Sequence, residues 1–297
     1  MYHVPVLLEE SVSGLNIDPD GVYLDLTFGG GGHSREILKR LKDGCLIGFD
    51  QDSDALANVP DDSRFIFVNH NFRYLRNFLR YCGYDEADGI LADLGVSSHE
   101  FDEAGRGFSF RFDAELDMRM NQRARLTAAD VVNDYTAEDL TRILGDWGEV
   151  ETPWKVANCL VKARAAAPVT TTAQLVGAVK PCTPKKDEAK FLTKLFQALR
   201  IEVNGEMEAL KMALEQSLRV LKPGGRLVVI SYHSLEDRLV KNFMRSGNFS
   251  GQVEKDFFGR SQAPFDLVTR KAVTPSAEEL DRNPRSRSAK LRAAVKR

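Results

Sequence analysis

Short apolar runs and helix-forming stretches alternate along the first hundred residues of the chain. Four apolar runs have the length of buried strands, and they span residues 22–26, 45–49, 65–68 and 89–92. Between the first two runs, Ser34 is expected to cap a helix that Gly44 ends. Strand, helix and strand in this order indicate parallel crossovers and therefore a doubly wound sheet.

The middle of the chain, from about Phe101 to Lys190, follows a different pattern. It contains no strand-like run, and Thr127 and Thr136 each stand three residues before an aspartate, which is the form of a helix capping box. After residue 206 the first pattern returns, with one apolar helix face and a strand at 226–231. The helix face consists of Met207, Leu210, Leu214, Leu218 and Leu221.

These patterns predict an α/β protein with an inserted all-helical domain. The sheet domain has two parts, residues 1–102 and residues 193–297, and the helical insertion occupies residues 103–192. Beyond Arg282 the chain carries basic residues and no acidic ones. We therefore expect a basic, solvated C-terminal tail.

The composition is that of an ordinary globular protein and narrows the choice of partners. Of the 297 residues, 43% are hydrophobic and 28% are charged. A formal net charge of −2 gives no overall basic field, so a local patch would have to hold any nucleic acid. No apolar run could cross a membrane and no signal peptide is recognisable. Four scattered cysteines without a C-x-x-C pair fit a reduced, cytoplasmic setting, and we expect no bound metal.

A run of glycines, Gly29 to Gly32, follows the first predicted strand and carries the most chemical information. Such a turn lets the backbone approach a ligand, and the helix after it offers free N–H groups. The nicotinamide-dinucleotide fingerprint requires glycine at position 34, where this chain has Ser34. Asp25, just before the turn, would repel a pyrophosphate but suits an ammonium or sulfonium group. The turn therefore favours S-adenosylmethionine as the ligand, and a turn without any ligand is the structural alternative.

Two further acids, Asp50 and Asp93, end the second and fourth predicted strands. The carboxyl ends of parallel strands meet at one edge of the sheet, where ligands bind. We therefore expect Asp25, Asp50 and Asp93 to face one site, with Asp50 accepting hydrogen bonds from the ribose of a nucleoside. Taken singly, each acid is equally well explained as a surface or helix-capping residue.

Eight segments of the chain resemble the ribosomal RNA small-subunit methyltransferase H family, also called the MraW family. They include the glycine turn, the segment around Asp93 and the stretch Ser231-Tyr232-His233-Ser234. In full, they lie at residues 3–10, 27–34, 88–98, 106–110, 116–120, 196–201, 230–238 and 283–288. The resemblance covers nearly the whole chain and is far more specific than a glycine turn alone.

This resemblance implies a Rossmann-like class I methyltransferase fold with S-adenosylmethionine as the cofactor. It also implies methylation of the N4 amine of a cytidine in the decoding (P-site) region of bacterial 16S rRNA, so the partner would be 16S rRNA or the small ribosomal subunit. The residues that it assigns to the cofactor are Gly31, Gly32 and His33 at the methionine end, Asp50 at the ribose, Phe72 at the adenine, Asp93 near the adenine or the methyl donor, and Glu100. Many members have glutamine at the position of Glu100, which can accept but not donate a hydrogen bond when it is ionised.

The amine of the target cytidine must lose a proton during methyl transfer, and the chain must offer an acceptor. We expect Asp93 or backbone carbonyls of residues 94–98 to accept this proton. In the alternative interpretation, Asp93 only binds the cofactor. His33 is expected to pack or to form a hydrogen bond rather than to act as a base. His233 either belongs to the start of a helix or reaches the target base.

Two other stretches bear on RNA binding. Residues 106–112 interleave aromatic rings with cations, which suits the stacking of an unpaired base, although such runs are also common in cores. Arg285 and Arg287 in the tail would contact phosphate if RNA is the substrate. A nicotinamide-dependent oxidoreductase and a non-catalytic RNA-binding factor are the competing function classes, and the sequence does not determine the oligomeric state.

Overall fold

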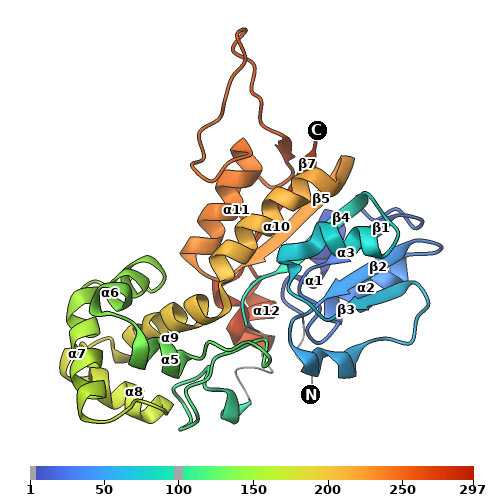
Figure 1. Cartoon of the computed structure of the whole chain (residues 1–297). Coiled ribbons are helices and arrows are strands. Elements are labelled where there is room, and N and C mark those ends of the chain that lie inside the picture. The colour runs from blue at the N-terminus through green and yellow to red at the C-terminus, as the bar shows by residue number, and fades with distance from the viewer. Residues whose placement is uncertain (1–4, 97–102) are drawn as a thin grey trace. The chain divides into compact units, whose positions relative to one another are not determined.

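The computed structural model describes residues 5–96 and 103–297 of the chain (Figure 1). The chain divides into two compact units, one formed by Met1–Gly95 with Met207–Arg297 and the other by Val96–Glu206. We call them the sheet unit and the helical unit. The helical unit thus interrupts the sheet unit in sequence, which is the arrangement that the residue pattern predicts.

The sheet unit is built on seven strands in the order β3-β2-β1-β4-β5-β7-β6. They are β1 (Val22–Asp25), β2 (Cys45–Phe49), β3 (Phe65–Val68), β4 (Ala87–Asp93), β5 (Leu221–Ser231), β6 (Phe265–Leu267) and β7 (Lys290–Lys296). The first five pair in parallel, whereas β7 pairs antiparallel with β5 and β6. The four strands predicted in the first hundred residues are confirmed. The parallel order β3-β2-β1-β4-β5 is that of a doubly wound, Rossmann-like sheet, as the sequence predicts.

Strand β5 begins earlier than the sequence suggests. Leu221 already pairs with Ala87, and the regular ladder resumes where Arg226 pairs with Gly89. The register shifts between these two pairs, so residues 223–225 form an irregularity within the strand rather than a turn before it. Proline and glycine are accommodated there because a bulge needs no continuous ladder of hydrogen bonds.

Helices cover both faces of the sheet. They are α1 (Leu8–Leu15), α2 (Gly32–Arg40), α3 (Leu75–Tyr81), α10 (Glu206–Val220), α11 (Ser234–Ser246) and α12 (Ala277–Arg282), with short 3-10 turns at Ser53–Asn58, Phe72–Tyr74 and Pro284–Ser288. Successive strand residues point to opposite faces. Ile90 and Ala92 therefore join the core beneath α3, α10 and α11, while Leu91 joins the core beneath α1 and α2.

The predicted limits of the first crossover helix are wrong. Helix α2 begins at Gly32 with Gly31 as its N-cap residue, and it ends at Arg40, before Gly44. Ser34 is buried inside the first turn, where its hydroxyl donates a hydrogen bond to Asp25 instead of capping the helix. The cause is tertiary, since an enclosed carboxylate at the end of β1 needs a donor and Ser34 supplies it.

The expected solvated C-terminal tail is also wrong. Residues 290–296 form strand β7, which lies between β5 and β6 in the sheet. Leu291 and Ala293 are buried, and Ala293 pairs with Val228. The basic residues of the strand have partners: Arg292 and Lys290 form ion pairs with Asp237 of α11. The charge of this segment is therefore largely used within the fold.

Within its described residues, 96 and 103–206, the helical unit has five helices around a core of its own. They are α5 (Ala128–Asp134), α6 (Ala137–Asp146), α7 (Pro153–Ala166), α8 (Thr172–Val179) and α9 (Glu188–Asn204), with 3-10 turns at Ala104–Arg106 and Lys180–Cys182. Thr127 forms the predicted capping box with Asp130, whereas at Thr136 only the bond from the Asp139 N–H to the hydroxyl follows the predicted pattern.

The limits of this unit differ from the expected 103–192. Its first residue is Val96 and its last is Glu206. Helix α9 lies within it because the apolar side chains of α9, such as Leu195 and Leu199, pack into the core of the helical unit with Ile143 of α6. Periodicity predicts a helix at this position but does not reveal which core the helix joins.

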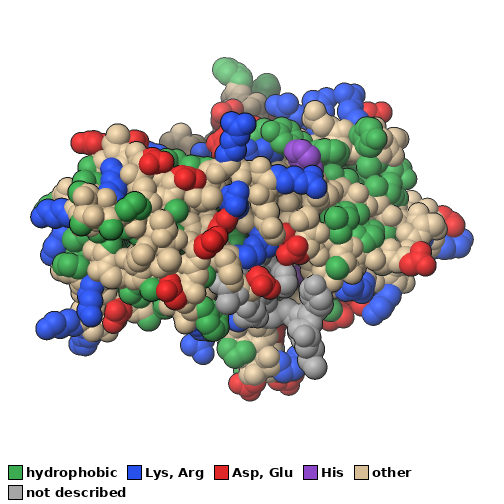
Figure 2. Space-filling model, turned by 60° about the horizontal axis from the view of Figure 1, so that its bottom comes forward, with side chains coloured by type: hydrophobic (Ala, Val, Ile, Leu, Met, Phe, Trp, Pro, Cys, Tyr) green, Lys and Arg blue, Asp and Glu red, His purple; other side chains and the backbone are tan. Residues whose placement is uncertain are grey.

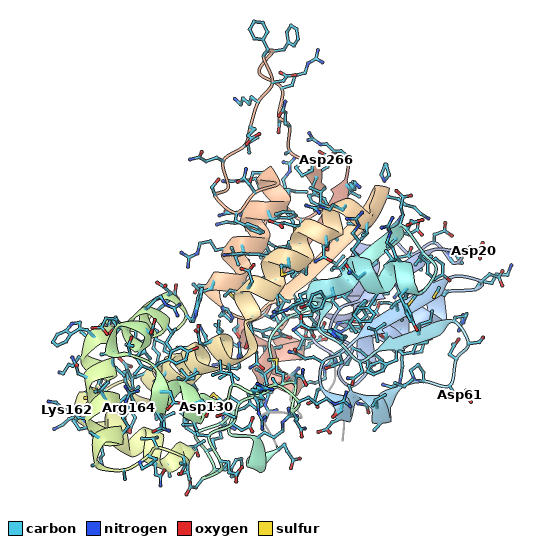
Figure 3. All side chains as sticks on the ribbon, viewed as in Figure 1. Asp20, Asp61, Asp130, Lys162, Arg164 and Asp266 are labelled. Atoms are coloured by element: carbon cyan, nitrogen blue, oxygen red, sulfur yellow. The ribbon has the colours of Figure 1, made fainter. Side chains whose placement is uncertain are left out.

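A polar arm leaves the sheet unit between α11 and β6, close to Asp266 (Figures 1 and 3). It turns back at an isolated bridge between Lys255 and Ser261, and its tip exposes Phe257 and Phe258 almost completely. Among the described residues, no helix has the length and apolar character that a membrane crossing requires.

Candidate active site

The carboxyl ends of β1, β2 and β4 lie side by side, because β1 pairs with both neighbours. Asp25 closes β1 and is buried. Its two oxygens accept hydrogen bonds from the Ser34 hydroxyl at 2.6 Å and from the Thr27 N–H at 3.1 Å. Burial raises the pKa of Asp25, and these two hydrogen bonds oppose the rise. Asp25 therefore joins the strand end to the helix that follows the glycine turn.

The glycine turn has a backbone that other residues could not adopt without strain. Gly31 has a φ of 72°, in the left-handed region that favours glycine. At Gly32 the limit is space, because an added Cβ would lie 2.1 Å from Cγ of Pro5. Helix α2 begins directly after this close approach. The turn thus places the amino end of a nine-residue helix at the site edge, and neither Gly31 nor Gly32 adds a side chain there.

Asp50 follows β2 and holds the glycine turn from the neighbouring strand. One oxygen accepts a hydrogen bond from the Gly29 N–H at 2.7 Å, and the other accepts one from the Asp52 N–H at 2.8 Å. Removal from water raises the pKa of Asp50 to about 6, although both bonds lower it. Each carboxylate oxygen can accept a further hydrogen bond, so Asp50 retains the capacity to hold hydroxyl groups of a ligand.

Asp93 ends β4 and lies between two rings. Its Oδ1 accepts a hydrogen bond from the Tyr232 hydroxyl at 2.8 Å, and its Oδ2 lies 3.8 Å from Nδ1 of His33. The backbone N–H of Asp93 donates to the Thr27 hydroxyl at 2.7 Å. Removal from water raises the pKa of Asp93 to about 6, against the lowering effects of His33 and Tyr232. With 21% of its side chain exposed, this carboxylate can still reach a ligand.

The ring of His33 is fixed on both sides. Its Nε2 lies 3.1 Å from the carbonyl oxygen of Val6, and because a carbonyl only accepts, Nε2 carries a hydrogen. Nδ1 then faces Asp93. His33 is buried, which agrees with the expectation that it packs and forms hydrogen bonds near the site.

Phe72 belongs to the 3-10 turn that follows β3, and Asn71 caps this turn. Its ring shares a small apolar hollow with Leu26 and Ala92 near the strand ends and with Leu214 of α10. The free volume of this hollow is only about 10 Å³, room for a single water molecule, and most of its other walls are buried core side chains. Among the residues expected at the cofactor, Glu100 lies outside the described residues, as do 97 and 98 of the 94–98 segment.

The structure also adds two residues that the sequence analysis did not assign, Tyr232 and Thr27. Each contacts Asp93 directly. Tyr232 lies in residues 230–238, one of the segments that resemble the family, and this resemblance is the sequence signal that could have identified it. His233, its neighbour, is the N-cap residue of α11 and exchanges hydrogen bonds with Glu236. His233 therefore caps the helix that begins at Ser234, which supports the structural interpretation of His233.

The aromatic and basic stretch 106–112 is divided between the interior and the surface of the helical unit. Arg106 donates hydrogen bonds to the carbonyls of Arg119 and Met120, and Phe108 is buried. Phe112 is an exposed ring of the stretch, at 49% exposure. The structure therefore favours the core interpretation for Arg106 and Phe108.

Comparison with known proteins agrees with this geometry. The sequence pattern of the MraW methylase family matches residues 1–297. The chain is 63% identical to the ribosomal RNA small subunit methyltransferase H of Parabacteroides distasonis over 99% of this chain and 97% of that protein. It is 60% identical to the protein of the same name from Bacteroides fragilis, over 100% of this chain and 98% of the relative. The relative from Cytophaga hutchinsonii is 55% identical over 99% of each chain. A parallel sheet with a glycine turn and acids at its carboxyl edge, together with these matches over the full chain, shows that this protein is a methyltransferase of the MraW methylase family.

Proposed function

We propose that this methyltransferase transfers the methyl group of S-adenosylmethionine to the N4 amine of a cytidine in the decoding region of 16S rRNA. The names of its relatives support ribosomal RNA of the small subunit as the substrate. The resemblance described above supports the cytidine amine. The observation that carries the proposal is the set of three enclosed carboxylates, Asp25, Asp50 and Asp93, beside a glycine turn.

These carboxylates fit a positively charged ligand. In the described part of the chain, neither lysine nor arginine forms an ion pair with any of the three, and the pKa of each is raised. A cation entering the site edge would relieve this unfavourable burial of negative charge. A pyrophosphate would instead add negative charge and make this burial more unfavourable. The donor set therefore suits a sulfonium compound better than a nicotinamide dinucleotide.

The proposed positions along the cofactor follow from the contacts of each residue. Asp50 would accept hydrogen bonds from the ribose hydroxyls, and the ring of Phe72 would lie against the adenine. The bare backbone of Gly31 and Gly32, with His33 behind it, would face the methionine end. S-adenosylmethionine supplies an electrophilic methyl group, and the protein supplies position and exclusion of water.

Asp93 is the proposed acceptor for the amine proton. The lone pair of a cytosine amine is delocalised into the ring, so an acceptor near its N–H assists attack and removes the proton afterwards. A pKa of about 6 makes Asp93 a stronger base than an ordinary aspartate while leaving it ionised at neutral pH. Tyr232 holds one oxygen of this carboxylate, and the other oxygen, 3.8 Å from Nδ1 of His33, remains available to accept the amine hydrogen. The target base must leave its stack or lie in an open loop to reach this position.

The test is label transfer from methyl-tritiated S-adenosylmethionine to RNA of the small subunit, followed by digestion to nucleosides. We expect the label in N4-methylcytidine, and a thermal shift of the protein with S-adenosylmethionine but not with NAD. Label in a different nucleoside would overturn the assigned amine. No transfer to naked RNA, to partly assembled subunits or to finished subunits would overturn the proposed substrate.

A further inference from the structure

A surface groove of about 260 Å³ lies outside the candidate active site, on the sheet unit. It runs between the turn and helix of residues 72–81 and helix α10. Its charged side chains are Arg73, Arg76, Arg219 and Glu215. We call it the arginine groove. With three cations against one anion, it is a local basic patch on a chain whose net charge is −2.

Gln216 gives the groove a fixed shape. Its Nε2 donates hydrogen bonds to the carbonyls of Arg73 at 2.5 Å and Met212 at 3.0 Å, and its Oε1 accepts one from the backbone N–H of Arg76 at 3.2 Å. Leu75 and Leu214 beneath it belong to one buried core. The two walls, some 140 residues apart in sequence, are therefore held together before any ligand arrives.

Arg76 and Arg219 in the groove differ in their ion pairs from two other arginines of the sheet unit. Arg80 forms an ion pair with Asp85, and Arg64 forms one with Asp62. No ion pair is recorded for Arg76 or Arg219 with any described residue. Figure 2 shows basic and acidic side chains interspersed over the face that it displays, so a pocket dominated by one sign is a local feature.

The arginine groove and the apolar hollow beside Phe72 are both lined by the turn at Phe72–Tyr74 and by helix α10. Phe72 and Leu214 point into the apolar hollow, whereas the next residues along each element, Arg73 and Glu215, line the groove. Tyr74 adds an aromatic ring that is 41% exposed at the groove. A ligand in the groove would thus lie beside the segment whose Phe72 is proposed to lie against the adenine.

We infer that the arginine groove binds the phosphodiester backbone of the RNA substrate, at nucleotides that flank the target cytidine. This inference rests on the proposed function, because it takes RNA as the substrate. Guanidinium groups match phosphate oxygens in geometry and charge, and an exposed tyrosine ring can stack on an unpaired base. The groove therefore contributes to RNA affinity and register, while the strand-end carboxylates hold the methyl donor.

The experiment compares the double variant Arg76→Gln/Arg219→Gln with Arg80→Gln, a control on the same helix whose arginine is already paired. RNA of the small subunit without ribosomal proteins is titrated onto each protein at several salt concentrations. We expect the double variant to bind about tenfold more weakly in low salt. Its plot of log affinity against log salt should also be flatter by about 1 to 2, because each lost phosphate contact removes about 0.7–0.9 from the slope. Affinity for S-adenosylmethionine should be unchanged, and Arg76→Lys/Arg219→Lys should restore most of the slope.

Three results would overturn the inference. The first is RNA affinity and salt slope equal to those of Arg80→Gln. The second is a loss of affinity for S-adenosylmethionine in the double variant, which would make the groove part of the cofactor site. The third is displacement of RNA from the wild-type groove by millimolar inorganic phosphate, which would indicate a site for small anions. Binding is measured separately from methyl transfer, so a failure of the proposed reaction would be visible in the labelling experiment alone.

Discussion

Aspartates of the sheet unit occupy two opposite environments. At the site edge, Asp25, Asp50 and Asp93 are enclosed without a lysine or arginine partner among the described residues, and the pKa of each is raised. On α11, Asp237 is also largely enclosed, yet its carboxylate accepts hydrogen bonds from Arg292 at 2.7 Å and Lys290 at 3.4 Å. Burial raises the pKa of Asp237, but these two cations outweigh it and the net shift is downward.

Under the proposed function, this difference separates acids that stabilise the fold from acids that serve the ligand. Asp237 ties α11 to β7 and contributes to the stability of the fold. The three acids at the site edge oppose folding slightly, because charge is enclosed there without compensation. Such an arrangement persists where a ligand supplies the missing positive charge. The comparison can be tested by changing members of each group and measuring chemistry, ligand affinity and stability separately.

The largest effect is expected for Asp93→Asn. Loss of the proton acceptor should lower the rate of methyl transfer by about a hundredfold or more, because general bases typically contribute 10²–10⁴. Cofactor affinity should change much less, and both are measured with the tritiated donor and by calorimetry. A full rate with unchanged cofactor binding would assign proton removal to the backbone of residues 94–98. Equal losses of rate and affinity would make Asp93 a cofactor-binding residue only.

The next effect concerns Asp50→Ala, which should weaken S-adenosylmethionine binding by about ten- to a hundredfold. The physical reason is the loss of charge-assisted hydrogen bonds, each worth about 1.5–3 kcal/mol. The matched control is Asp62→Ala, at an acid of the same unit whose pKa is lowered to about 2 by Arg64. Calorimetric titration with the cofactor measures both. Equal affinity in the two variants would contradict a role of Asp50 at the ribose.

Cofactor affinity should depend on pH in a defined direction. Asp50 and Asp93 have pKa values of about 6 in the free protein, so they are protonated below this pH and cannot compensate a cation. Affinity for S-adenosylmethionine should therefore rise from pH 5 to about 6, by up to roughly tenfold per pH unit for each proton released, and level off above. The stability of the cofactor-free protein should depend on pH in the opposite direction. Because the folded-state pKa values are raised, the free energy of unfolding should fall as pH rises from about 4 to about 6. Affinity independent of pH in this range would contradict the assigned charges.

Asp237→Asn should mainly affect stability. We expect the free energy of unfolding to fall by about 1–3 kcal/mol, since Arg292 and Lys290 lose a charged acceptor. Because the folded-state pKa of Asp237 is lowered, its stabilisation is present above pH 4 and is lost as pH falls below the ordinary value. Denaturant unfolding at pH 7 and pH 3 measures the difference. An equal loss at both values would mean that the ion pairs contribute nothing.

The smallest effect is expected for Tyr232→Phe. The Tyr232 hydroxyl stabilises the ionised form of Asp93, so its removal should raise the pKa of Asp93 above 6. The acidic limb of the rate profile should then move to higher pH, by up to about one unit. Tyr23→Phe, which removes a hydroxyl that accepts from the Asp18 N–H, is the control. An unchanged profile would show that Tyr232 does not act on the reacting carboxylate.

The parallel strands were predictable because both faces of the sheet are covered. Strands buried on both sides appear in the sequence as continuous apolar runs, and β2 and β3 have the bounds of the runs that predicted them. The glycine turn and the acids after β1, β2 and β4 were predictable for a related reason, since chain order places all of them at one edge.

The wrong predictions share one physical cause. Ser34 donates to Asp25 rather than capping a helix, and residues 290–296 form a strand because β5 offers an open edge and Asp237 offers a counter-charge. Helix α9 joins the helical core although it follows the expected end of the insertion. In each case the deciding partner is distant in sequence or belongs to another element, and local patterns carry no record of it.

By itself, the amino-acid sequence determined the order of strands and helices, the glycine turn and the acids that follow the parallel strands, because periodicity and backbone preference act over a few residues. The tertiary structure alone decided which groups meet. It brought the Tyr232 hydroxyl to Asp93, 139 positions away, and joined Gln216 to the backbone of Arg73 across 143 positions. These contacts depend on how the sheet pairs and how helices pack on it, so only the folded chain shows that the Tyr232 hydroxyl holds Asp93 and that Gln216 joins the two walls of the arginine groove.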